Sequence, residues 1–117
     1  MGYYSDVAIG MKKNEAVKFL SEGAKVEGEG FVFKTNFQVI DRNEYTIIRW
    51  PDIKWYDDYK DVAWVMEYLK KLSEEGKPVA YVSIGEALDD AEAWYENDDD
   101  YSLYNTVWVR RYIDFAA

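Results

Sequence analysis

The spacing of the apolar residues changes several times along this chain, and the order of those changes limits the folds open to it. Apolar residues at every second position predict strands, and apolar residues three or four positions apart predict helices. Strand patterns occur at 3–11, 31–39, 45–50, 79–84 and 105–115, and the third is expected to stop at Pro51. Helical patterns occur at 14–23 and 57–75, with Gly23 and Gly76 placed to end them.

The order of these elements is strand, helix, strand, strand, helix, strand, followed by an acidic segment and a last strand. It predicts an α+β fold of the ferredoxin-like β-α-β-β-α-β type with an additional C-terminal strand, in which two helices cover one face of an antiparallel sheet. With 117 residues, of which 49% are hydrophobic, the chain can bury one core. We therefore expect a single domain over residues 1–117.

Composition excludes several kinds of chemistry. The sequence has no Cys and no His, so disulfides, the usual zinc ligands and a Ser–His triad at Ser83 are excluded. We expect no catalytic residues, no cofactor and no metal site. The sequence has neither a signal-peptide pattern nor an apolar run of about 20 residues, and the expected location is cytoplasmic, without membrane contact.

Negative charge is concentrated late in the sequence. The net charge is -9, but residues 1–77 carry 12 Lys or Arg against 14 Asp or Glu, whereas residues 78–117 carry 2 against 9. Such a field repels nucleic acid and attracts basic surfaces. The segment 86–100 is therefore either a solvated loop or short helix, or a recognition surface for a basic partner. Its predicted partner-binding residues are Glu86, Asp89, Asp90, Glu92, Trp94, Tyr95, Glu96, Asp98, Asp99 and Asp100.

A second concentration of aromatic residues lies at 50–59, between a predicted strand and a predicted helix. Large aromatic side chains there can lock the strand-to-helix connection over the sheet, or they can form an exposed anchor patch for a partner. We include Trp50, Trp55 and Tyr56 among the predicted partner-binding residues on the second interpretation.

Two alternative functions remain open from the residues. Phe31 and Phe33 on a strand of a ferredoxin-like sheet are typical of an RNA-binding platform, although Glu27 and Glu29 beside them oppose binding to phosphates. The second alternative is a metal-assisted hydrolase that uses the clustered carboxylates. Their spacing does not match a calcium-binding EF-hand loop.

The aromatic and acidic motifs also carry a resemblance. The opening residues 2–7, the W-x-x-x-K-W-Y-x-x-Y-x-D-V run at 50–62, and Ile84-Gly85-Glu86 followed by Asp89-Asp90 are similar to small acidic proteins encoded by bacteriophages. The resemblance implies a non-enzymatic protein in the host bacterial cytoplasm that binds and inhibits a basic host protein, such as a defence nuclease, in the manner of anti-CRISPR or anti-restriction proteins. Pairing of the last strand within the chain or in a homodimer stays open.

Overall fold

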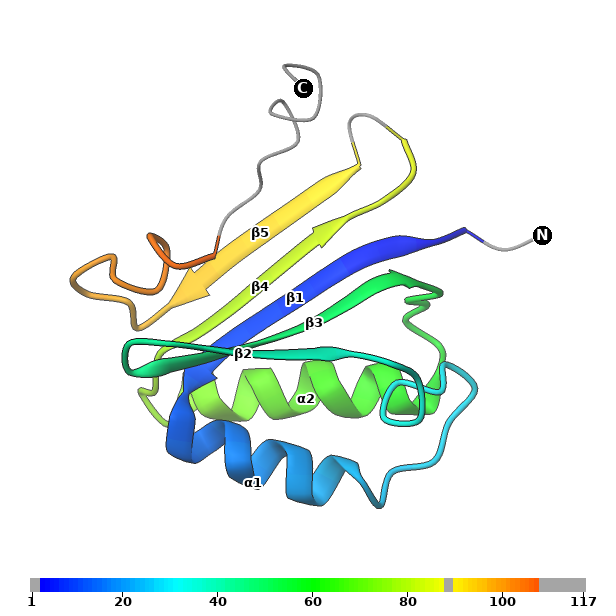
Figure 1. The fold of residues 1–117 in the computed structure, drawn as a ribbon, viewed down its shortest axis with the longest axis horizontal. Helices are drawn as coiled ribbons and strands as arrows, with labels where there is room; N and C mark the ends of the chain where they lie inside the picture. The colour runs from blue at the N-terminus through cyan, green and yellow to red at the C-terminus, as the bar shows by residue number, and fades with distance from the viewer. Residues whose placement is uncertain (1–2, 88–89, 108–117) are drawn as a thin grey trace.

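The computed structural model describes residues 3–87 and 90–107, which build one sheet and two helices (Figure 1). The elements in chain order are β1 Ser5–Lys12, α1 Lys13–Gly23, β2 Gln38–Arg42, β3 Tyr45–Ile53, α2 Lys60–Glu74, β4 Val79–Ile84 and β5 Ala91–Glu96. The strands lie in the order β2-β3-β1-β4-β5, and every neighbouring pair is antiparallel. Each helix therefore connects two parallel strands that have one antiparallel strand between them.

The coarse prediction is confirmed: the fold is α+β, and the two helices lie on one side of a five-stranded antiparallel sheet (Figure 1). The strand order differs from that of a plain ferredoxin-like fold, because β5 continues the sheet beside β4. This fifth strand lies inside the acidic segment. The strand predicted at 105–115 is not found where the structure describes it, because residues 105–107 belong to a turn and the remainder lies outside the described residues.

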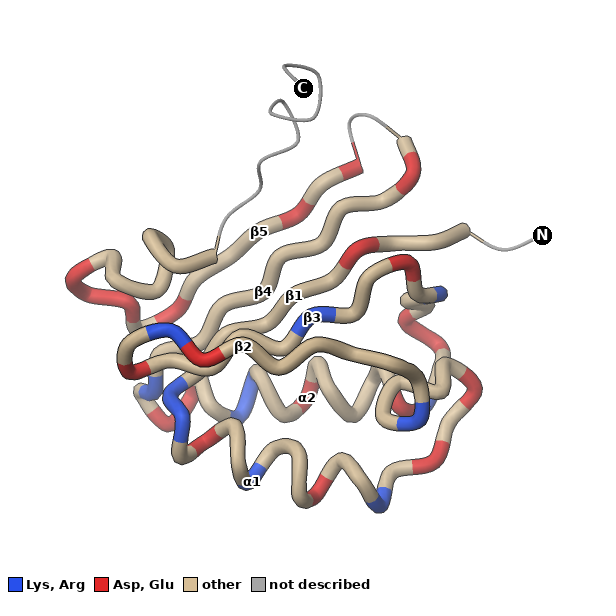
Figure 2. Tube along the Cα trace, in the orientation of Figure 1, with Lys and Arg blue, Asp and Glu red and all other residues tan. Residues whose placement is uncertain are grey.

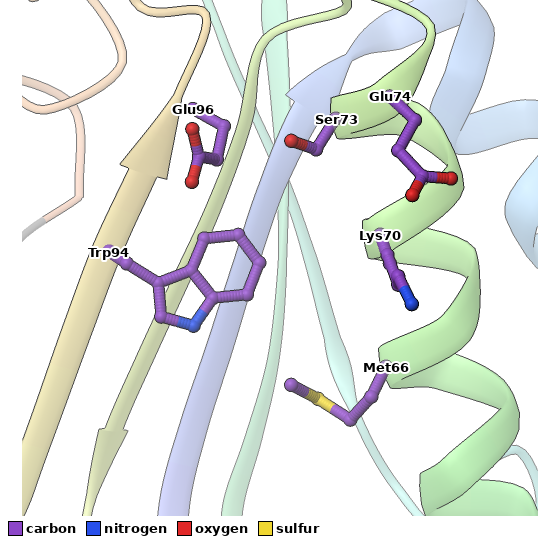
Figure 3. Close-up of a pocket in the computed structure, with 6 residues that line it drawn as sticks. All are labelled: Met66, Lys70, Ser73, Glu74, Trp94 and Glu96. Atoms are coloured by element: carbon purple, nitrogen blue, oxygen red, sulfur yellow. The ribbon is translucent and has the colours of Figure 1, made fainter.

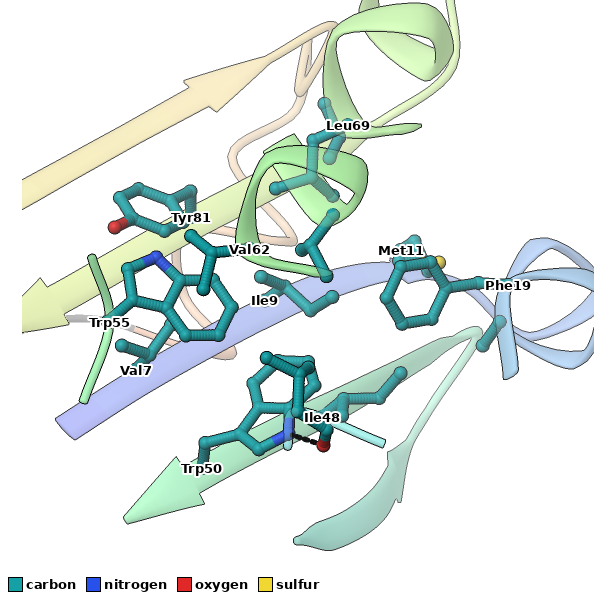
Figure 4. Packing of buried hydrophobic residues seen from close by; sticks show 14 of the residues in the cluster. Val7, Ile9, Met11, Phe19, Ile48, Trp50, Trp55, Val62, Leu69 and Tyr81 are labelled. Atoms are coloured by element: carbon teal, nitrogen blue, oxygen red, sulfur yellow. Dashed lines mark hydrogen bonds between the residues drawn. The ribbon is translucent and has the colours of Figure 1, made fainter. Parts of the chain in front are cut away.

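The main core lies between the sheet and the helices, and it follows from the alternation along the strands (Figure 4). Val7, Ile9 and Met11 of β1 point toward the helices and are fully buried. Each side chain of this kind contributes about 1.5–3 kcal/mol when it leaves water. The helical spacing predicted within 57–75 is confirmed, because Val62, Val65, Leu69 and Leu72 of α2 are buried on one stripe and Met66 is half-buried. On α1, Ala16 and Phe19 are buried in the core, whereas Val17 is exposed.

Of the strand predicted at 31–39, only Gln38 and Val39 are in a strand, because residues 32–35 form turns and a bend and β2 begins only at Gln38. Phe31 is exposed and has a left-handed backbone, with φ at 52°. Phe33 packs on core rings such as Phe19, with a centroid distance of 5.4 Å. An RNA-binding platform would need both rings on a sheet surface. Neither ring lies on a sheet surface here, so the RNA-binding alternative loses the strand on which it depended.

A buried carboxylate holds this irregular segment against α2. Asp61 is only 1% exposed and accepts hydrogen bonds from the backbone N–H of Gly30 at 3.1 Å, Val32 at 2.9 Å and Val62 at 3.0 Å. In turn, the carbonyl of Val32 accepts a hydrogen bond from Trp50 Nε1 at 2.7 Å. The conformation of this segment is therefore set by residues far away in the sequence.

Strand β3 does not stop at Pro51, as the sequence predicted, but continues to Ile53. Its register with β1 shifts between Ser5 and Val7, opposite this point. Asp52 takes a left-handed φ of 57° in the same place. This local irregularity lets the strand pass a proline, which cannot donate to a regular ladder.

The sheet face opposite the helices is covered in part by residues 98–107. Leu103 is fully buried there against Tyr45, Ile47 and Ala80. A Cβ atom added to Gly10 would lie only 2.9 Å from Leu103 Cδ1, so the glycine makes room for this contact. The segment after β5 thus forms a second, smaller core.

Candidate functional site

Strand β5 forms one edge of the sheet, and it supplies the central residues of the acidic segment. It pairs with β4 in an unbroken register, from Ile84 opposite Ala91 to Val79 opposite Glu96. Within the described chain no further strand follows β5 in the sheet. Its outer edge therefore presents backbone N–H and C=O groups that have no strand partner among those residues.

The side chains of β5 alternate between the two faces of the sheet. Trp94 stacks on Tyr81 on the helix side, with ring centroids 5.5 Å apart, so Glu92 and Glu96 share that face. Tyr95 points the other way and joins the smaller core. Burial raises the pKa of the Tyr95 hydroxyl, which donates a hydrogen bond to the carbonyl of Val107 at 2.7 Å. Tyr95 is thus structural, whereas half-buried Trp94 is flanked by two exposed carboxylates.

An open groove of about 500 Å³ lies between β5 and the second half of α2 (Figure 3). Trp94 projects from β5 toward the helix across this groove (Figure 3). The groove is lined by Met66, Lys70, Ser73 and Glu74 from α2 and by Trp94 and Glu96 from β5. It combines an apolar floor with two carboxylates and one ammonium group.

One side chain connects the two walls of the groove at its end. Asn97 follows β5 in a left-handed conformation, with φ at 57°. Its Nδ2 donates hydrogen bonds to the carbonyl oxygens of Ser73 at 3.0 Å and Lys77 at 2.9 Å. These carbonyls belong to the last turn of α2 and the residues after it, where the Ser73 carbonyl also accepts the backbone N–H of Gly76 at 3.1 Å. Asn97 therefore fixes the end of β5 to the end of the helix.

The acids before β5 contact the N-terminal segment. Glu86 Oε2 accepts a hydrogen bond from the backbone N–H of Tyr4 at 2.7 Å, and Asp90 accepts one from the Tyr3 hydroxyl. Asp89 lies outside the described residues. Glu86 and Asp90 thus help to fasten the start of the chain to the β4–β5 connection.

The acids after β5 differ from one another. Asp98 accepts hydrogen bonds from the backbone N–H of Leu103 at 2.9 Å and Tyr104 at 2.8 Å, and so it holds the turn that covers the second core. Hydrogen bonds from Ser102 lower the pKa of Asp100. Asp99 is exposed and forms no hydrogen bond or ion pair within the described ranges.

The charge of this edge is uniformly negative. Figure 2 shows acidic positions along β5 and in the loops at both of its ends, and no basic position among them. The sequence has no Lys or Arg between Pro78 and Val109. Glu92 and Glu96 form no ion pair within residues 3–87 and 90–107. Two solvated carboxylates are therefore available to a ligand on either side of Trp94.

The aromatic residues predicted at 50–59 lie elsewhere. Trp50 is fully buried and Trp55 is 9% exposed, with their ring centroids 5.2 Å apart in the main core (Figure 4). The Tyr56 hydroxyl accepts a hydrogen bond from the backbone N–H of Tyr3 at 2.7 Å. These three residues hold the fold together. Burial takes both tryptophans out of any docking surface, which corrects the anchor-patch interpretation.

Sequence reasoning missed the α2 wall of the groove. The helical pattern at 57–75 gave no binding role to Met66, Lys70, Ser73 or Glu74. Their spacing at i, i+4, i+7 and i+8 does place them on one face of a helix. That this face borders β5 depends on the sheet order, which periodicity does not reveal.

The groove has no metal-binding arrangement. In the described part of the chain no three Asp or Glu side chains are grouped so that they could hold a metal ion. No helix there is long and apolar enough to cross a membrane.

Searches against protein-family models, curated proteins and solved structures find no match for the chain. The arrangement of residues around β5 is therefore the basis for assigning a function.

Proposed function

We propose that this chain is a non-enzymatic interaction protein that binds a basic partner protein through the β5 edge and the groove beside it. The observation that carries the proposal is the half-buried Trp94 between two exposed carboxylates, Glu92 and Glu96, on an edge strand. Aromatic anchors surrounded by charges are typical of binding hot spots. Solvated acids that lack partners in the described chain are suited to Lys and Arg from another protein.

The same charge distribution supports selectivity for basic surfaces. With a net charge of -9 and no Lys or Arg between 78 and 109, the β5 side repels phosphates and attracts cations over about a Debye length, roughly 8–10 Å. Nucleic acid and anionic lipid are therefore poor ligands for this edge. A basic protein is drawn to it.

The resemblance to small acidic phage proteins suggests the class of partner. We propose a basic host protein in the bacterial cytoplasm, such as a defence nuclease, which this chain would inhibit in the manner of an anti-CRISPR or anti-restriction protein. The nucleic-acid-binding groove of such an enzyme carries the Lys and Arg that an acidic edge requires.

The observed strand order also supports a more specific description of the fold. We propose that β2-β3-β1-β4 corresponds to the ferredoxin-like sheet and that β5 is the added strand, because both helices link parallel strands separated by one antiparallel strand. An experimental structure with another connection of the strands would contradict this proposal.

The binding proposal is tested with a double charge reversal, Glu92→Lys with Glu96→Lys. Tagged protein is incubated with bacterial lysate over a series of salt concentrations, and the captured proteins are identified. Captured nucleases are then assayed for inhibition by this chain. The reversal turns two attractions of about 0.2–1 kcal/mol each into repulsions of similar size, about 0.8–4 kcal/mol in total, so we expect at least about fourfold less capture.

A matched control is the double reversal Glu22→Lys with Asp58→Lys, which changes the net charge equally. Glu22 is exposed on α1, which packs against β1 and β3, and Asp58 is exposed in the turn before α2, at the far end of that helix from the groove. Capture should survive in this control at low salt. Equal loss in both double variants, or no loss in either, would contradict binding at β5.

A further inference from the structure

The outer edge of β5 also carries main-chain hydrogen-bonding groups that no other strand in residues 3–87 and 90–107 pairs with. The strand has six residues, and the backbone groups that do not pair with β4 point outward. Ala91, Glu92, Ala93 and Glu96 are exposed, so within the described part of the chain the side chains along this edge leave its backbone accessible. An extended peptide can add to such an edge through main-chain hydrogen bonds.

The side chains of β5 set what an added strand would carry. Glu92, Trp94 and Glu96 share one face at intervals of two residues, and the two carboxylate positions are about 13 Å apart along the strand. Directly opposed residues on neighbouring strands have Cβ atoms about 5 Å apart. A strand beside β5 would therefore place three consecutive same-face side chains against an acid, an aromatic ring and an acid.

The groove extends this pattern away from the strand. Trp94 and Met66 offer an apolar surface to a middle side chain, while Glu74 and Glu96 lie at one end of the same hollow (Figure 3). A basic side chain opposite Glu96 can lay its methylene stem on Trp94 and keep its charged end among carboxylates. The other face of β5 carries Ala91 and Ala93, which place little restriction on a neighbour, and Tyr95, which joins the smaller core.

A second copy of this chain is a poor occupant of the edge. Two β5 strands side by side would bring Glu92 and Glu96 against the same residues of the partner, and like charges directly opposite one another destabilise a sheet. Acidic side chains on an edge strand commonly prevent this kind of self-association. The charge thus favours a basic strand from another protein.

We propose that the partner binds by adding an extended segment to the β5 edge, with Lys or Arg at two positions four residues apart and an apolar residue midway between them. This inference rests on the proposed function, because it specifies how the basic partner is recognised. The main-chain ladder supplies affinity, and the alternating side chains supply specificity.

The probe is a blocked, fluorescent peptide of sequence TKTVTKT, whose two lysines and valine share one face of a strand. Its binding to the full chain is measured by fluorescence anisotropy at low salt. An isomer of the same composition, TKVTKTT, has its lysines three positions apart and therefore on opposite faces. We expect the isomer to bind more weakly by up to about fivefold, because one lysine then faces away from β5.

Backbone methylation separates strand addition from simple charge attraction. Two further peptides carry N-methyl groups on the odd or on the even residues, which removes half of the N–H donors without changing charge. Only alternate residues of an added strand donate to β5, so one set should weaken binding about tenfold or more and the other much less. Hydrogen exchange of alternate β5 amides should slow on binding.

The outcomes distinguish this inference from the proposed function. If both methylated peptides and the isomer bind as well as the parent, while Glu92→Lys with Glu96→Lys still abolishes capture from lysate, strand addition is wrong and acidic docking stands. If the parent peptide does not bind at low salt, the inference is also overturned. If the reversal leaves both peptide binding and capture unchanged, the proposed function fails.

Discussion

Replacing Asp61 by alanine should destabilise the protein severely. The carboxylate is 1% exposed and accepts hydrogen bonds from the backbone N–H of Gly30, Val32 and Val62. Each buried donor left without an acceptor costs about 1–3 kcal/mol. The Val62 N–H lies in the first turn of α2, and its bond to Asp61 is buried like that of Val32. We expect a loss of about 3–5 kcal/mol, against a total of about 5–15 kcal/mol for a domain of this size.

The assay is equilibrium unfolding in urea and by heat, followed by tryptophan fluorescence. At about 4 °C per kcal/mol, the expected loss lowers the melting temperature by roughly 12–20 °C. Asp61→Asn keeps one acceptor oxygen and should lose about half as much. Asp58→Ala, an exposed acid three residues earlier, should stay within about 0.5 kcal/mol of the parent chain. If Asp61→Ala fell within about 1 kcal/mol of the parent, the carboxylate would not hold the loop as described.

Two further predictions concern acids outside the groove. Hydrogen bonding from Lys77 at 3.0 Å lowers the folded-state pKa of Glu75, so the contribution of this carboxylate to stability is present above the unfolded pKa of about 4.3 and is lost as pH falls through the lower folded value. Below about pH 5, the unfolding free energy of Glu75→Gln should therefore vary less with pH than that of the parent chain. An identical pH dependence of the two proteins would contradict the ion pair. Asp98→Ala removes the acceptor for the N–H groups of Leu103 and Tyr104 and should lower the unfolding free energy by about 1–2 kcal/mol in the same urea assay. The control substitution Asp99→Ala should change the unfolding free energy by almost nothing. Equal effects of the two substitutions would show that Asp98 does not hold the turn.

The helices and three of the strands could be predicted from the sequence because their periodicity matches how they pack. Val7, Ile9 and Met11 alternate against a covered face, and Val62 and Val65 recur at helical spacing on a buried stripe. Binary patterns of this kind depend only on local geometry. They predict where an element lies, but they do not determine its neighbours in the sheet.

The failures have a common physical origin in contacts between distant residues. Phe31 and Phe33 alternate like strand residues, yet Asp61 takes the neighbouring backbone N–H groups and the chain turns instead. In β5 the alternation of Glu92, Trp94 and Glu96 was present in the sequence, but the negative charge favoured a loop. Tertiary contacts decide such cases, because β-propensity depends strongly on context.

The amide of Asn97 bears on how tightly a ligand can bind in the groove. Because it bridges the end of β5 and the carbonyls of Ser73 and Lys77, the separation of the two walls is fixed when the protein folds. The walls of the groove are then already ordered before a ligand binds, so little of the binding free energy is lost in ordering them. Such a rigid opening selects by length and shape, so this one asparagine would restrict which basic segments fit the acidic edge.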